Sequence, residues 1–175
     1  NGGVIIFPTE TVYGIGADIK NKEAINKIYK IKKRDLNKPL SYHIGSLDQI
    51  DINSIDKKYK KLIDKFWPGP LTLIYYDKKY HDVIGVRYPS CPIFLKIAQA
   101  FGRPIAGTSV NFSNQGSIFS FRDINKEIID QVDLAIDAGE TEFKQESTIL
   151  DISGGEPVVV REGAVSKEEI LQFLL

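Results

Sequence analysis

The chain has 175 residues, 42% of them hydrophobic and 26% charged, and its basic and acidic residues balance to a net charge of zero. This composition is typical of one folded domain and argues against a disordered chain, and no apolar run approaches the roughly 20 residues of a membrane span. One Cys and two His exclude an intrachain disulfide and the common zinc-binding spacings, so we expect a reducing, cytoplasmic setting.

The charges are unevenly distributed along the sequence. Between Lys20 and Lys38, eight basic residues stand against two acidic ones, a net charge of +6. Between Asp123 and Glu156, ten acidic residues stand against two basic ones, a net charge of −8. A basic segment in a neutral protein favours a small anionic ligand over a long polyanion.

Apolar periodicity predicts the elements of the N-terminal half. Strands are predicted at residues 4–7, 12–17, 40–44 and 71–76, and helices at 22–33 and 54–67. Pro68, Gly69 and Pro70 end the second helix, and Trp67 is expected in the core. The first helix runs into the charged segment "KKRDLNKPL". Basic residues at a helix C-terminus interact favourably with the helix dipole, but here they continue beyond the predicted helix end, which the dipole does not require.

The C-terminal half continues to mix strands and helices. Strands are predicted at 84–88, 105–108, 134–137, 148–151 and 158–161, and helices at about 94–101, 123–131 and 167–175, the last with Ser166 as N-cap. The mixture, without a linker or repeat, predicts an α/β fold over residues 1–175: one domain of three layers, a twisted mixed β-sheet flanked by helices.

Several common catalytic and nucleotide-binding motifs are absent from the sequence. There is no P-loop and no GxSxG, and Gly14 and Gly16 lack the third glycine of a dinucleotide fingerprint. Short polar stretches instead lie beside predicted strands, where α/β proteins bind ligands. These stretches are residues 8–11, 32–38, 41–43, 87–89, 108–111, 147–148 and 161–163.

Six ordered segments of the chain resemble those of the YrdC family of L-threonylcarbamoyladenylate synthases, in its short form. They read "GGVIIFPTETVYGIGAD", "KKRDLNKPLSYHI", "FWPGPLTLIYY", "GVRYPSCPI", "PIAGTSVNFSNQGS" and "ESTILDISGGEPVVVREGAV". The resemblance implies a YrdC-like fold and a reaction in which L-threonine, bicarbonate and ATP give threonylcarbamoyl-AMP and pyrophosphate. The product serves the modification of adenosine next to the anticodon of transfer RNA, completed by threonylcarbamoyl-transferase partner proteins.

The resemblance also implies roles for individual residues. Catalytic charge would come from Lys32, Arg34 and Lys38, and the ATP, with Mg²⁺ bridging its phosphates, would be bound by Arg34, Lys38, Asn111, Ser117 and Arg161. L-threonine would be bound by Thr11, His43, Arg87, Ser109 and Ser147, with Arg87 as a bidentate partner of its carboxylate. The protein itself is expected to supply no dedicated metal site.

Simpler interpretations remain open for single residues. His43 could be a partly buried strand residue, Arg87 a surface salt bridge, and Thr11 or Ser147 a turn or capping hydroxyl. Two departures from the family pattern affect the loop from Ser113 to Ser120. Asn114 replaces a usual glycine, which is tolerable because Asn can adopt the left-handed backbone conformation. Phe119 replaces a usual nucleotide-contacting threonine, for which Ser117 or Ser120 could substitute.

Two other functions are compatible with the sequence. The first is a transfer RNA-binding or double-stranded RNA-binding module without catalysis, motivated by the basic segment; weak transfer RNA binding is also compatible with the enzyme. The second is carbamoyl transfer of the kind performed by YrdC-like domains of hydrogenase maturation proteins, which carry zinc-finger cysteines that this chain lacks. The sequence contains no Met, so we expect its natural start to lie upstream.

Overall fold

The computed structural model describes residues 2–113 and 115–174. Its strands form one mixed sheet in the order β7-β1-β2-β6-β3-β5-β4-β8-β9. The strands are β1 (Ile5–Phe7), β2 (Gly14–Asp18), β3 (Ser41–His43), β4 (Leu71–Asp77), β5 (Asp82–Arg87), β6 (Ile105–Ser109), β7 (Leu134–Ala135), β8 (Thr148–Asp151) and β9 (Val158–Arg161). Three pairs are parallel (β1 with β7, β3 with β5, β4 with β8) and the other five are antiparallel, which confirms the predicted mixed sheet.

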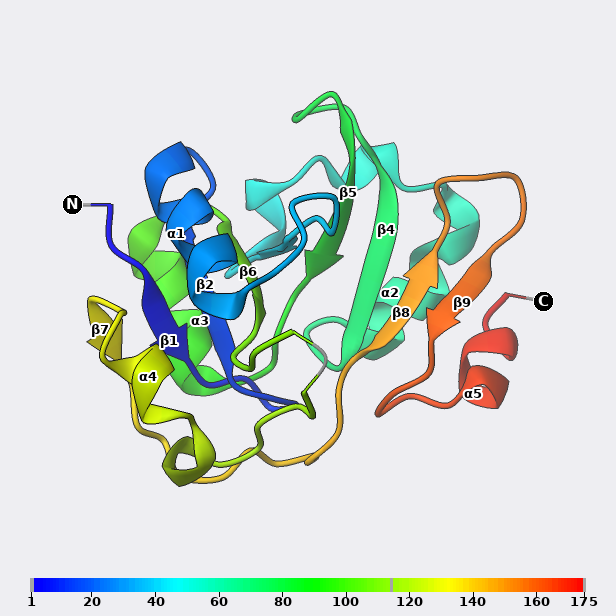
Figure 1. Cartoon of the computed structure of the whole chain (residues 1–175). Helices are drawn as coiled ribbons and strands as arrows, with labels where there is room; N and C mark the ends of the chain where they lie inside the picture. The colour runs from blue at the N-terminus through cyan, green and yellow to red at the C-terminus, as the bar shows by residue number, and fades with distance from the viewer. Residues whose placement is uncertain (1, 114, 175) are drawn as a thin grey trace.

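Five α-helices accompany the sheet in the described residues. They are α1 (Lys22–Lys32), α2 (Lys60–Phe66), α3 (Pro92–Phe101), α4 (Lys126–Ile129) and α5 (Lys167–Leu171). Figure 1 shows α1 and α3 beside β1 and β2 at one end of the sheet, and α2 and α5 beside β4, β8 and β9 at the other. None of the helices described is long and apolar enough to cross a membrane.

Two predicted helices are shorter at both ends in the structure than predicted. The helix predicted at 54–67 is broken by short 3-10 turns at Ile52–Ser54 and Lys57–Tyr59, because Asp51 and Asp56 accept hydrogen bonds from the backbone two residues ahead. The helix predicted at 123–131 shortens to α4, since Asn125 caps it by accepting from Glu127 N.

Two other predicted elements end earlier in the structure than predicted. The strand predicted at 134–137 is confined to the two residues of β7, which pair only with β1. The C-terminal helix stops at Leu171, while its start is as predicted: Ser166 and Glu169 form a capping box.

Successive side chains along β1 point to opposite faces of the sheet, and helices cover both faces. This gives the predicted three layers at this end of the sheet. Val4 and Ile6 pack with Ala24 and Ile28 of α1, while Phe7 packs with Phe94 of α3 on the opposite face. At the other end a larger cluster joins β4 and β5 to α2 and α5 and contains Trp67, as predicted.

The glycines of β2 serve packing rather than phosphate binding. A Cβ at Gly14 would lie 2.6 Å from the ring of Phe7, and one at Gly16 would lie 2.9 Å from it. Their lack of side chains lets this buried ring lie against the strand. Phe7 in turn contacts the ring of His43 edge-on, with 5.4 Å between centroids, so the packing of β2 supports the wall of the site described next.

Candidate functional site

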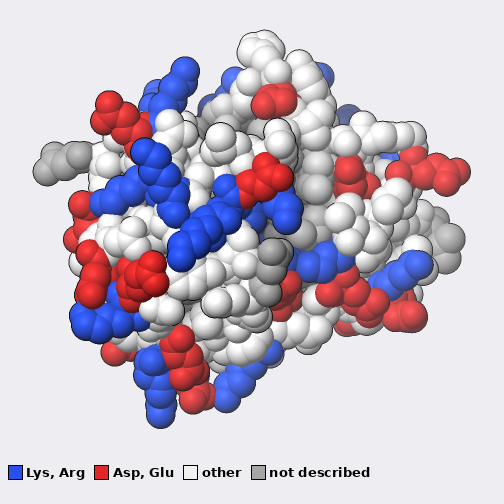
Figure 2. Space-filling model, in the orientation of Figure 1, with Lys and Arg blue, Asp and Glu red and all other residues white. Residues whose placement is uncertain are grey.

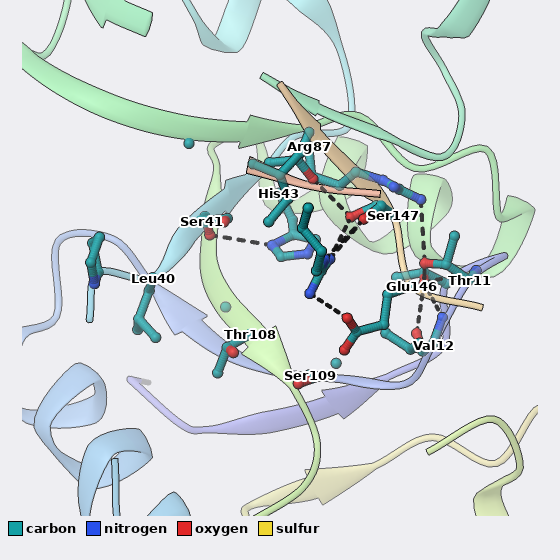
Figure 3. A pocket seen from close by; sticks show the side chains of 18 of the residues that line it. Thr11, Val12, Leu40, Ser41, His43, Arg87, Thr108, Ser109, Glu146 and Ser147 are labelled. Atoms are coloured by element: carbon teal, nitrogen blue, oxygen red, sulfur yellow. Dashed lines mark hydrogen bonds and ion pairs between the residues drawn. The ribbon is translucent and has the colours of Figure 1, made fainter. Parts of the chain in front are cut away.

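A cavity of about 400 Å³ opens in the middle of the sheet. Its walls come from strands β2 to β6, β8 and β9 and from the loops after β1, after α1 and before β8. Seven of the predicted site residues line it: Thr11, Arg34, His43, Arg87, Ser109, Ser147 and Arg161. Figure 3 shows Thr11, His43, Arg87 and Ser147 turned toward one another although they lie far apart in the sequence.

Arg87, at the end of β5, forms a buried ion pair with Glu10. The two residues are 2% and 3% exposed, so Arg87 does not form a surface salt bridge. Its Nη2 donates to Glu10 and to Thr11 Oγ1, whereas Nε and Nη1 have no partner among the described residues. Buried N–H groups without partners are costly, so this end of the cavity is suited to an acceptor such as a carboxylate.

His43 is neutral at physiological pH. Burial, and then the nearby charge of Arg87, lower the pKa of its imidazole to about 4. Its Nδ1 lies 3.3 Å from the carbonyl oxygen of Ser41, and the backbone of Ile105 is a second hydrogen-bond partner of the ring. A neutral ring beside a guanidinium adds polarity to the cavity without adding charge.

Lys32 lies behind the cavity rather than in its wall. The residue is 1% exposed, and its ammonium donates to the carbonyl oxygens of Ser109 and Asn111 and, at 3.3 Å, to Asn111 Oδ1. Burial, and then the charge of Arg34, lower the pKa of Lys32 to about 7. Lys32 therefore fixes the backbone after β6, and any effect it has on a ligand passes through that loop.

The amide of Asn111 is used within its own loop. Its Oδ1 accepts from Ser109 Oγ at 2.5 Å, and its Nδ2 donates to the carbonyl oxygens of Phe112 and Gln115 at 3.1 and 2.7 Å. Asn111 does not line the cavity. Residue 114, where the sequence departs from the family pattern, lies outside the described residues.

The loop after α1 presents Arg34 to the cavity but leaves Lys38 exposed. Arg34 Nε and Nη2 donate to the carbonyl oxygens of Lys38 and Pro39, each at 3.1 Å, which fixes the guanidinium over the loop. Lys38 contributes this carbonyl and is not part of the lining. Figure 2 shows Lys and Arg side chains gathered on this face over α1 and the loop that follows it.

Arg161, the last residue of β9, lies against the segment before β8. Its Nε and Nη2 donate to the carbonyl oxygen of Ser147 at 3.2 and 2.8 Å, and its Nη1 lies 2.5 Å from Glu146 Oε2. The other oxygen of Glu146 accepts from Ser117 Oγ. Glu146 also lines a second, more open cavity of about 390 Å³, shared with Ser117 and Phe119.

Glu10 and Glu146 are site residues that sequence reasoning missed. Glu10 falls inside the polar stretch at 8–11, and Glu146 directly precedes the predicted Ser147, but neither is among the residues for which the resemblance implies a role. The only signal available was their position at a strand end beside other polar residues. Which arginine each would meet depends on strand pairing across the whole sheet.

No group of three or more His, Cys, Asp or Glu side chains able to hold a metal ion occurs within residues 2–113 and 115–174. Among the described residues that line the main cavity, Glu146 is the one carboxylate. A Mg²⁺ ion needs only one or two protein carboxylates when phosphates supply its other ligands. The donor set thus fits a metal that arrives with a nucleotide and does not fit a metal bound by protein alone.

Comparison with known proteins gives one consistent result. Residues 1–163 match the family model Sua5_yciO_yrdC, described as "Telomere recombination". The chain is 35% identical to the threonylcarbamoyl-AMP synthase of Pyrococcus abyssi, over 97% of this chain and 53% of that protein. It is 36% identical to the putative threonylcarbamoyl-AMP synthase of Methanocaldococcus jannaschii, over 97% of this chain and 84% of that protein.

A solved structure agrees with the sequence matches. The structure of Pyrococcus abyssi Sua5 complexed with L-threonine superimposes with a TM-score of 0.92 at 34% identity, covering 99% of this chain and 54% of that one. The chain thus spans about half the length of the Pyrococcus relative. On the family model, the identities and the shared fold, the chain belongs to the Sua5/YciO/YrdC family.

Proposed function

We propose that the protein is a threonylcarbamoyl-AMP synthase, which joins L-threonine, bicarbonate and ATP and releases pyrophosphate. The observation that carries the proposal is the single cavity on which Arg34, Arg87 and Arg161 converge from three distant segments. The names of the Pyrococcus and Methanocaldococcus relatives, and the bound threonine named for the Pyrococcus structure, support it.

In this proposal the deep end of the cavity binds threonine. The partnerless Nε and Nη1 of Arg87 favour a carboxylate there. Neutral His43 and the hydroxyls of Thr11, Ser109 and Ser147 offer hydrogen bonds to the amine and the side-chain hydroxyl without adding charge. We expect the size of this end of the cavity to set the preference for threonine over larger amino acids.

The nucleotide would lie nearer Arg34 and Arg161. The threonine amine takes up bicarbonate as a carbamate with loss of water, and a carbamate oxygen attacks the α-phosphorus as the bond to pyrophosphate breaks. Because both reactants are anionic, the main contribution of the protein is positioning and neutralisation of charge. Lys32 contributes by fixing the Ser109–Asn111 backbone, and Mg²⁺ would arrive with the phosphates. Partner proteins would then transfer the threonylcarbamoyl group to transfer RNA.

The test is pyrophosphate release from purified protein with each substrate omitted in turn. We expect release only when L-threonine, bicarbonate and ATP are all present, and no increase when carbamoyl phosphate replaces bicarbonate. Release that persists without threonine would contradict the proposal. Release that requires carbamoyl phosphate would favour the carbamoyl-transfer alternative.

Binding of transfer RNA without catalysis is a second candidate, motivated by the Lys and Arg side chains gathered over α1 and the loop that follows it in Figure 2. Several cations of the segment have other partners: Lys32 is buried, Lys27 pairs with Asp133 at 3.0 Å, and Lys33 lies 3.8 Å from Glu127. This candidate predicts tight binding that weakens steeply with salt. Weak binding at physiological salt would leave the enzyme proposal as the better explanation.

A further inference from the structure

The charges of the main cavity are largely compensated by the protein itself. The charge of Arg87 is balanced by Glu10, and that of Arg161 by Glu146. Arg34 donates to two carbonyl oxygens and has no carboxylate partner among the described residues. A nucleoside triphosphate carries several negative charges, so the cavity as folded offers too few free cations to receive it alone.

The two carboxylates differ in their access to the cavity. The side chain of Glu10 is 2% exposed and lies behind Arg87, outside the lining. The side chain of Glu146 is 32% exposed and borders both cavities. A solute in the main cavity can therefore reach Glu146 but not Glu10, and Figure 3 shows Glu146 turned into this space opposite Ser147.

One edge of the Arg161 guanidinium is fixed by a backbone carbonyl, and its remaining nitrogen contacts a carboxylate. Its Nε and Nη2 donate to the carbonyl oxygen of Ser147, and its Nη1 lies 2.5 Å from Glu146 Oε2. If a phosphate oxygen replaced Glu146 at Nη1, the guanidinium would stay in place. The exchange would free a carboxylate beside the phosphates, where two anions repel unless a cation lies between them.

We propose that Glu146 makes the cavity selective for a nucleoside triphosphate complexed with a divalent cation: its carboxylate gives up Arg161 to the phosphates and turns to the metal. This inference rests on the proposed function. It assigns to Glu146 a role in choosing the ionic form of the nucleotide, whereas Ser117, which donates to the same carboxylate, keeps it oriented.

The experiment measures the affinity for a non-hydrolysable ATP analogue by calorimetry, in Mg²⁺ and in EDTA. The variants are Glu146→Gln and, as a matched control, Glu156→Gln, which removes a carboxylate from the exposed turn between β8 and β9. In the native protein and the control, Mg²⁺ should strengthen binding by at least about tenfold. In Glu146→Gln, metal-free nucleotide should bind more tightly than in the native protein, and Mg²⁺ should add less than about threefold.

A full Mg²⁺ effect in Glu146→Gln would overturn the inference and leave the proposed function intact. Tighter metal-free binding with that effect unchanged would also overturn it, since Glu146 would then only compete with phosphate for Arg161. If the native protein binds no nucleotide with or without metal, the proposed function fails as well. Equal thermal unfolding of the variants is the folding control, and Glu146→Ala replaces the glutamine variant if that one is unstable.

Discussion

The Glu10–Arg87 pair is the most buried charged contact of the site. Removing one member of such a pair leaves an uncompensated charge in a region of low polarity, which typically costs about 3–5 kcal/mol. We therefore expect Glu10→Gln to lower the free energy of unfolding by that amount. The double variant Glu10→Gln with Arg87→Met should lose less than the sum of the two single changes.

Urea unfolding of the four proteins forms a double-mutant cycle that measures this coupling. Additive losses would mean that the two side chains do not stabilise each other.

Lys32 and Lys38 come from the same charged segment but differ in burial. Lys32→Met should cost roughly 1–3 kcal/mol, because the buried carbonyls of Ser109 and Asn111 lose their donor. Lys38→Ala, at an exposed position, should change stability by less than about 0.5 kcal/mol. Chemical denaturation measures both, and equal losses would show that the buried contacts of Lys32 contribute nothing.

His43 gives a pH dependence with a definite sign. Its pKa is near 6.5 in an unfolded chain and about 4 in the fold, so the unfolded state binds a proton over this range while the folded state does not. Stability therefore falls as pH drops from about 6.5 toward 4, by up to about 2 kcal/mol at pH 5. The loss between pH 7 and pH 5 should be smaller in His43→Gln; an equal loss in both proteins would assign it to other groups.

At the scale of elements, the turn after β9 packs closely against the segment before β8. A Cβ at Gly163 would lie 2.2 Å from the carbonyl oxygen of Glu146 and 2.7 Å from the carbonyl carbon of Ser147. Gly163→Ala should displace this segment, lower stability by roughly 1–3 kcal/mol and weaken threonine binding.

Gly154→Ala is the matched control, because no atom within 4 Å of its Cβ would interfere. Calorimetric titration with threonine, together with thermal unfolding, compares the two variants. A Gly163→Ala protein as stable as the control would mean that the close approach does not constrain the segment.

Sequence patterns predicted strands better than helix lengths. The strands at 148–151 and 158–161 have the predicted bounds, because their short runs of β-branched and apolar residues coincide with sheet pairing. The helix predicted at 54–67 is broken because periodicity alone gave too little weight to Asp51 and Asp56, which form local hydrogen bonds instead.

For the whole molecule, the resemblance predicted the convergence of seven residues on one cavity, which periodicity alone could not have done. The resemblance did not predict several side-chain contacts of the folded chain. These are the burial of Lys32, the hydrogen bonds of Asn111 within its loop, and the pairing of Glu10 and Glu146 with arginines. The contacts of Lys32 with Ser109 and of Glu10 with Arg87 each join residues 77 positions apart, and only the folded sheet brings such residues together.

We propose that one cavity holds an amino acid and a nucleotide side by side, bound by different arginines. Steady-state pyrophosphate release by Arg34→Ala and Arg87→Lys tests it most directly, since lysine at position 87 can still pair with Glu10. We predict that Arg34→Ala raises the KM for ATP at least about tenfold with little change for threonine, and that Arg87→Lys does the reverse. Equal changes in both KM values in each variant, or no change in either, would show that the two substrates are not bound by separate arginines.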